Sequence, residues 1–96
     1  MMECSKVIYT GHTYERMFER CIGKYDIIEA LKLGEVIIEY PDDKPFPSFL
    51  IAHKKDSKMI HLVAVIDRLT KTCYIITIYE PYPEIWDDEF KTRRKQ

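Results

Sequence analysis

The stretch Met59-Ile-His-Leu-Val-Ala-Val-Ile-Asp67, followed shortly by Thr72-Cys-Tyr-Ile-Ile-Thr-Ile-Tyr79, decides the fold of this chain. Both segments are rich in β-branched residues, which pack well on a pleated surface, so both are predicted to be strands. The polar residues Arg68–Lys71 lie between them. Because short connections favour antiparallel neighbours, the two segments are predicted to form a β-hairpin.

The first of these strands is apolar on both faces. Its alternating apolar side chains are Met59, Val63 and Val65 on one face, and Ile60, Leu62, Ala64 and Ile66 on the other. Strands of this kind are usually central in a sheet and covered on both sides. Helices can cover one side, whereas the other needs the C-terminal segment, a partner protein or a second copy of the chain. We favour a partner or a homodimer.

Four further elements precede the hairpin. Glu35–Tyr40 and Ser48–His53 are predicted strands, and the loop 41–47 between them holds three prolines, which cannot sit in a ladder. Upstream, the spacing of apolar residues predicts helices over Thr13–Cys21 and Lys24–Leu33. The predicted buried stripes are Tyr14, Met17, Phe18 and Cys21 in the first helix, and Ile27, Ile28 and Leu31 in the second.

These elements predict one α+β domain over residues 1–96, in which two N-terminal helices pack on a mainly antiparallel sheet of about four strands. A chain of 96 residues is long enough for one core and too short for two. The ordered core is expected over about residues 7–90, followed by a basic tail at 91–96.

Composition limits the classes of partner. The net charge of −1 gives no general attraction to nucleic acid, so RNA binding needs a local basic cluster, to which the tail Lys91–Lys95 could contribute. No apolar run approaches the roughly 20 residues that span a bilayer. Residues 1–6 lack the order of a signal peptide. We therefore expect a cytoplasmic protein with no membrane contact.

The cysteines and histidines suggest neither a disulfide framework nor a metal site. Cys4, Cys21 and Cys73 are odd in number and form no CxxC pair, so three reduced thiols are predicted, with Cys21 and Cys73 packed as small hydrophobic side chains. The three histidines show no HxH or HxxxH spacing. No metal and no cofactor are predicted.

Two groups of residues are candidates for chemistry. His12, Arg16 and Arg20 follow one ridge of the first helix, where a histidine and two guanidinium groups could hold a phosphate. The alternative is an ordinary solvated helix face. His61 interrupts an apolar strand and is either a hydrogen-bonded core histidine or a group that faces a cleft. Whether Tyr79 shares its face depends on the register of the hairpin.

Several motifs together resemble a known family. They are His12-Thr-Tyr-Glu-Arg16-Met-Phe-Glu-Arg20, Asp26-Ile-Ile-Glu-Ala-Leu31, Gly34-Glu-Val-Ile-Ile-Glu-Tyr40-Pro-Asp-Asp43, His61-Leu-Val63 and Ile75-Ile-Thr-Ile-Tyr79-Glu-Pro-Tyr-Pro83. The set is similar to the bacterial domain-of-unknown-function 4258 family. That resemblance implies a toxin of a type II toxin–antitoxin system with a RelE/barnase-like fold, related to RelE, MqsR and BrnT. It also implies a zinc-finger antitoxin of the YgiT type as partner.

The resemblance further implies a metal-independent endoribonuclease, in which the ribose 2′-hydroxyl attacks the adjacent phosphate. His12 or His61 would act as acid or base and Tyr79 would orient or donate, while Arg16 and Arg20 would bind phosphate. The alternative is a non-catalytic interaction module that binds a partner or dimerises through its apolar sheet face. A single open surface shared by these residues would favour the ribonuclease, and scattered or buried and paired residues would favour the module.

Overall fold

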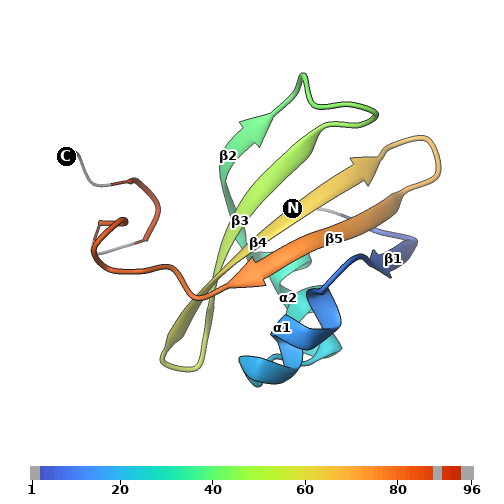
Figure 1. Cartoon of the computed structure of the whole chain (residues 1–96). Coiled ribbons are helices and arrows are strands. Elements are labelled where there is room, and N and C mark those ends of the chain that lie inside the picture. Colours follow the sequence, from blue (N-terminus) through green and yellow to red (C-terminus); the bar gives the residue numbers. More distant parts are fainter. Residues whose placement is uncertain (1–2, 88–89, 94–96) are drawn as a thin grey trace.

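The computed structural model describes residues 3–87 and 90–93 (Figure 1). Its elements in chain order are β1 (Lys6–Tyr9), α1 (Thr13–Glu19), α2 (Lys24–Leu33), β2 (Glu35–Tyr40), β3 (Ser48–Lys55), β4 (Lys58–Asp67) and β5 (Thr72–Tyr79). The α+β class is confirmed. The predicted bounds of α2, β2 and β5 agree with the structure, and those of β3 and β4 differ only at one end.

The sheet differs from the prediction in strand number and direction. It has five strands in the order β1-β5-β4-β3-β2. The pairs β2/β3, β3/β4 and β4/β5 are antiparallel, but β1 pairs with β5 in parallel, with Val7 opposite Cys73. The sheet is thus mainly antiparallel as predicted, but the predicted number of about four strands is wrong because it omits the parallel strand β1. β1 has only four residues and meets a partner far along the chain, so local sequence patterns do not reveal it.

The core lies between the sheet and the two helices, which sit on the same side of it (Figure 1). Buried side chains of β4 that face the helices are Ile60, Leu62, Ala64 and Ile66. Gly34 allows α2 to end against β3, because a Cβ atom there would lie 2.5 Å from the Ala30 carbonyl oxygen and 2.6 Å from Cγ2 of Ile51. Only glycine fits this close approach.

The first helix is rotated relative to the predicted stripe. Tyr14 and Phe18 are 52% and 88% exposed, whereas Thr13 and Met17 are buried. The Thr13 hydroxyl donates to the carbonyl oxygens of Thr10 (2.6 Å) and Ile75 (3.1 Å). The bond to Ile75 fixes this seven-residue helix to β5 through a polar side chain, so the face with the most apolar residues is not the buried one.

Two other burial predictions are corrected. Helix α1 ends at Glu19 because Cys21 adopts a left-handed conformation (φ 56°), and the Cys21 side chain is exposed rather than packed in the core. In α2, Ile27 and Leu31 are buried as predicted, but Ala30 takes the place predicted for Ile28, which is 36% exposed. Small Ala30 faces the close contact between helix and sheet.

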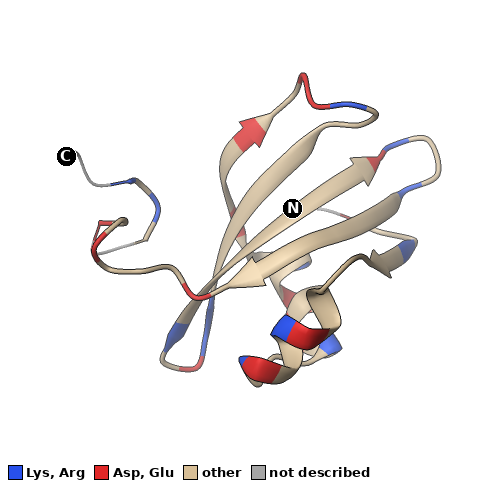
Figure 2. Ribbon diagram, viewed as in Figure 1, with Lys and Arg blue, Asp and Glu red and all other residues tan. Residues whose placement is uncertain are grey.

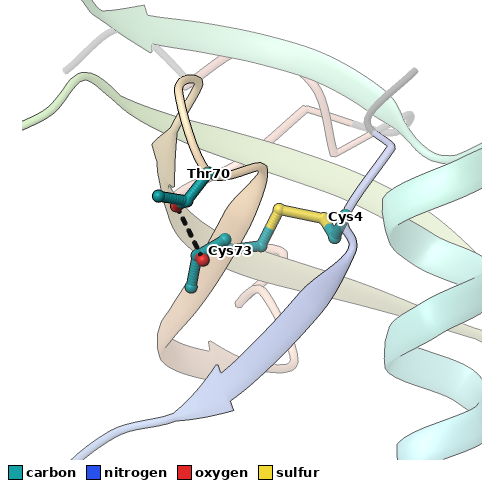
Figure 3. Close-up of a disulfide and its surroundings, with 4 residues drawn as sticks. Cys4, Thr70 and Cys73 are labelled. Carbon is teal, nitrogen blue, oxygen red and sulfur yellow. Dashed lines mark hydrogen bonds between the residues drawn. A yellow bond between two sulfur atoms is a disulfide. The ribbon is translucent and has the colours of Figure 1, made fainter.

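The prediction of three reduced thiols is wrong. Cys4 and Cys73 form a disulfide with a Cα–Cα distance of 5.7 Å, and only Cys21 is free (Figure 3). Cys73 is fully buried, in agreement with the prediction that it packs in the core. The bond joins the residues before β1 to the start of β5, so it fastens the edge strand that local sequence patterns do not reveal.

The C-terminal segment, defined here as residues 81–87 and 90–93, covers one end of the other sheet face. Trp86 is 3% exposed and packs edge-to-face on His61, with ring centroids 4.4 Å apart. The segment turns back on itself through a bridge between Trp86 and Arg93, and Lys91 reaches Glu35 at 2.9 Å. The C-terminal segment, one of the three covers expected for this face, thus supplies part of it.

Partner binding and dimerisation stay predictions. The rest of the predicted basic tail, residues 94–96, lies outside the described residues. Neither helix in the described part of the chain has the length and apolarity to cross a membrane.

Candidate functional site

An open groove of about 450 Å³ lies between α1, the end of β5 and the C-terminal segment. We call it the arginine groove. The residues that line it are Arg16, Arg20, Thr77, Tyr79, Glu80, Tyr82, Ile85, Trp86 and Arg93. Three of the five predicted site residues, Arg16, Arg20 and Tyr79, are therefore in one place.

Three guanidinium groups give the groove its charge. Arg16 lies in α1 and Arg20 is the residue at its C-terminal cap, whereas Arg93 comes from the C-terminal segment, where it lies 5.3 Å from the Trp86 ring centre. Figure 2 shows basic positions both on the helix α1 and on the C-terminal segment, each of which also carries acidic positions. Among residues 3–87 and 90–93, none of the three forms an ion pair.

Arg20 has an unmet hydrogen-bonding group. Its Nε atom is buried and has no partner within the described part of the chain. A buried donor without a partner costs about 1–3 kcal/mol, and more when the group is charged. Guanidinium groups bind the oxygens of phosphates and carboxylates in a bidentate manner. The groove is thus chemically suited to an oxyanion.

Tyr79 is held in the groove by a histidine behind it. His61 stands directly opposite Tyr79 in the β4/β5 register, so the two side chains share a face. His61 Nε2 donates to the Phe90 carbonyl oxygen at 2.7 Å, because a carbonyl can only accept. Nδ1 of neutral His61 then accepts the hydroxyl proton of Tyr79 at 3.2 Å.

The electrostatic environment reinforces this arrangement. Burial lowers the pKa of His61 below its usual 6.5, and the positive charge of Arg93 adds to this effect, while the hydrogen bond to Phe90 opposes it. Burial raises the pKa of Tyr79 above 10.0, against the opposing effect of Arg93. At neutral pH the pair therefore consists of a neutral imidazole and a protonated phenol.

A comparison with models of protein families shows to which family this chain belongs. The sequence model described as Domain of unknown function (DUF4258) matches residues 9–80, which is more than half of the chain. The chain belongs to the DUF4258 family. No significant match was found among curated proteins or among solved structures.

The matched region of this DUF4258 domain holds only part of the arginine groove. Arg16, Arg20 and Tyr79 lie inside residues 9–80, whereas Tyr82 and Arg93 lie beyond them. One wall of the groove is therefore supplied by residues that the family match does not include. The same holds for Cys4 of the disulfide.

The other two predicted site residues of the DUF4258 domain are placed differently. His12 is exposed, does not line the groove, and lies 3.3 Å from Glu15 of its own helix. His61 is fully buried beneath Tyr79 and is thus a buried, hydrogen-bonded histidine on the sheet face opposite the helices. A direct acid–base role for either one has no support from this geometry.

Six groove residues are missing from the sequence-based set: Thr77, Glu80, Tyr82, Ile85, Trp86 and Arg93. The Glu80 carboxylate lies 3.7 Å from Lys58. The sequence gives a weak signal for Arg93 through the basic tail, but its approach to α1 depends on the path of the C-terminal segment. Among the described residues, no group of three or more His, Cys, Asp or Glu side chains could hold a metal ion.

The lowered pKa of His61 makes a prediction about stability. The unfolded chain binds the His61 proton near pH 6.5, and the folded DUF4258 domain binds it only at lower pH. The free energy of unfolding should therefore fall as pH falls below 6.5, since the unfolded state then binds more protons. Denaturant unfolding measured between pH 7.5 and about pH 5 checks this.

The matched variants are His61→Leu and His12→Gln. His61→Leu should lose this part of the pH dependence, although it also lowers stability at neutral pH by leaving the Tyr79 hydroxyl without its acceptor. His12→Gln should keep the full dependence, because His12 is exposed. An unchanged slope in His61→Leu would contradict the assignment of a buried neutral imidazole.

Proposed function

We propose that this protein is an endoribonuclease that works without a metal ion and uses the arginine groove as its active site. The observation that carries the proposal is the convergence of Arg16, Arg20 and Arg93 on a groove that Tyr79 also lines. Positive charge and a proton-transfer group are the two things that phosphodiester cleavage by a 2′-hydroxyl needs.

The charge pattern supports a local rather than a general attraction for RNA. The whole chain carries −1. In the groove, three guanidinium groups meet one carboxylate, that of Glu80, which is also near Lys58. A phosphate in the groove would accept hydrogen bonds from the guanidinium groups that line it. Phosphate contacts of this kind provide most of the affinity of proteins for nucleic acids.

In the proposed mechanism, Tyr79 takes the proton of the attacking 2′-hydroxyl and passes its own proton to Nδ1 of His61. A bond forms between the 2′-oxygen and phosphorus, and the bond from phosphorus to the 5′-oxygen breaks. The arginines stabilise the extra negative charge on phosphorus. The 5′-oxygen takes a proton from water, and the resulting hydroxide returns His61 to its neutral form through Tyr79.

His61 is a positioning residue in this scheme. Its Nε2–H is fixed by the Phe90 carbonyl, so Nδ1 faces Tyr79. Its lowered pKa keeps Nδ1 free to accept a proton at neutral pH. The imidazolium that forms is stabilised by the hydrogen bond to Phe90.

The biological role proposed with this activity is that of a toxin in a type II toxin–antitoxin system. The family resemblance supports this role, and we propose with it a RelE/barnase-like fold, for which the two helices on a mainly antiparallel sheet are the coarse support. A zinc-finger antitoxin of the YgiT type is the proposed partner. It would stop cleavage by covering the arginine groove or by displacing the C-terminal segment.

The test is RNA cleavage by the purified protein in the presence of EDTA. We expect fragments that end in 2′,3′-cyclic phosphate. Arg20→Gln should lower the cleavage rate about 10²-fold, since it removes one charged donor from the transition state. Arg68→Gln is the matched control, because Arg68 is exposed and does not line the groove.

Growth of bacteria that express the protein tests the toxin role separately. Expression should arrest growth, and Arg20→Gln should relieve the arrest while Arg68→Gln should not. Unimpaired growth together with intact RNA after incubation with folded protein would overturn the proposal. Cleavage that EDTA abolishes would overturn its metal-independent form.

A second candidate function, a non-catalytic module that binds a partner protein, is favoured by one observation. The outer sides of the helices expose large apolar side chains: Phe18 and Tyr25 are both 88% exposed, and Leu33 is 70% exposed. Such side chains are common at protein interfaces. If this candidate is correct, Phe18→Ser should abolish partner binding, whereas changes in the arginine groove should have no effect.

A further inference from the structure

We infer that the arginine groove binds single-stranded rather than duplex RNA, and that one unpaired base stacks on Tyr82. This inference deepens the proposed function and rests on RNA as the ligand of the groove. It assigns a base-binding role to the C-terminal segment, whose residues lie beyond the part matched by the family, 9–80.

Tyr82 is the most exposed of the three aromatic rings that line the groove, the others being Tyr79 and Trp86. Its side chain is 64% exposed, and it lies next to Ile85, which is 42% exposed. Trp86 also lines the groove but is 3% exposed, because it packs between His61 and Arg93. Trp86 therefore supports the groove wall, and Tyr82 presents its ring to a ligand.

The neighbours of Tyr82 fit a nucleotide. The groove places its ring together with the guanidinium groups of Arg16, Arg20 and Arg93, so an exposed aromatic surface and several phosphate ligands line the same cavity. Proteins that bind single strands combine these two features: cations follow the backbone, and aromatic side chains stack on bases.

The size of the groove favours a single strand. Its volume of about 450 Å³ falls in the range of sites for small ligands, roughly 300–1,000 Å³. A base can present its face to Tyr82 only when it is not stacked within a duplex. A duplex would offer its phosphates to the arginines but no base to Tyr82.

The conformation around Tyr82 does not depend on its ring. The Tyr82 carbonyl oxygen accepts hydrogen bonds from the backbone N–H groups of Ile85 (3.0 Å) and Trp86 (3.1 Å). These bonds shape the turn that begins the C-terminal segment, and substitutions of the side chain leave them in place. The ring can therefore be removed without loss of the groove wall.

The experiment measures binding of a short fluorescent oligoribonucleotide whose 2′-hydroxyls are all methylated, so that it cannot be cut. Fluorescence anisotropy gives the dissociation constant. Tyr82→Ala should weaken binding about 5- to 150-fold, the range measured for loss of one base–aromatic stack. Tyr82→Phe should bind like the wild type, because the ring remains.

Two controls complete the design. Tyr25→Ala removes a ring that is 88% exposed but lies outside the groove, and it should bind like the wild type. The same oligonucleotide paired with its complement should bind at least about tenfold more weakly than the single strand, since stacking is lost. Thermal unfolding of each variant confirms that it is folded.

The outcomes separate this inference from the proposed activity. Wild-type affinity in folded Tyr82→Ala, or equal binding of duplex and single strand, would overturn the stacking inference even if RNA is cut. Loss of binding in Tyr82→Ala with no cleavage by the wild type would support the inference and overturn the ribonuclease. No binding of the oligonucleotide by the wild type would overturn the inference.

Discussion

Replacing Tyr79 by phenylalanine is expected to lower the rate of RNA cleavage by about 10²- to 10⁴-fold, the usual contribution of a positioned proton-transfer group. The ring fills the same space, so only the hydroxyl is lost. That hydroxyl is the donor to Nδ1 of His61 at 3.2 Å, and Tyr79 lines the arginine groove. The measurement is the rate of cleavage of a labelled RNA at saturating protein.

Binding separates this effect from a general defect. Tyr79→Phe should bind the methylated oligonucleotide like the wild type, because the arginines are unchanged. Tyr74→Phe is the matched control, since Tyr74 lies on the same strand opposite Val65 and does not line the groove. Full cleavage by Tyr79→Phe would show that Tyr79 transfers no proton, even if the groove binds RNA.

The rate should also depend on pH through His61. At pH values at which His61 becomes protonated, Nδ1 can no longer accept the proton of Tyr79, so cleavage should fall on the acid side. Since burial lowers the pKa of His61, this fall should lie below pH 6.5. An acid limb set instead by His12 would disappear in His12→Gln.

Loss of the Cys4–Cys73 disulfide is expected to lower the free energy of unfolding by about 2–4 kcal/mol. The bond closes a loop with a sequence separation of 69 and therefore restricts the unfolded chain strongly. It also fastens β1, which has only four residues and pairs with one strand. Denaturant unfolding of Cys4→Ser against the wild type measures this difference.

Cys21→Ser is the matched control, because Cys21 is exposed and free. Its stability should equal that of the wild type. Addition of a strong reductant should bring the wild type to the stability of Cys4→Ser and leave Cys4→Ser unchanged. Equal stability of oxidised wild type and Cys4→Ser would contradict a stabilising role for the bond.

Local patterns in the sequence determined most of the secondary structure. The bounds of α2, β2 and β5 follow from the spacing of apolar residues, from the content of β-branched residues, and from Gly34 and the prolines, which end helices and strands. The β4/β5 hairpin was predicted because its strands are joined by a short turn. These features depend on residues that are close in sequence, so the chain specifies them directly.

The candidate site was only partly predictable. Arg16 and Arg20 are spaced to share a ridge of α1, and Tyr79 ends a predicted strand, so their selection needed no tertiary information. The sequence did not decide whether His61 and Tyr79 share a face, because a shift of one residue in register reverses the answer. The structure places them opposite each other.

The sequence by itself determined the α+β class and the spacing that places Arg16 and Arg20 on one ridge. Other features were decided only by the tertiary structure, because they depend on contacts between residues that are distant in the sequence. The parallel strand β1, the disulfide and the approach of Arg93 to α1 are such features, since each joins segments separated by tens of residues. The tertiary structure also decided which face of α1 is buried. The Thr13 hydroxyl donates to the Ile75 carbonyl oxygen of β5, so the face with Thr13 is buried in place of the predicted apolar stripe.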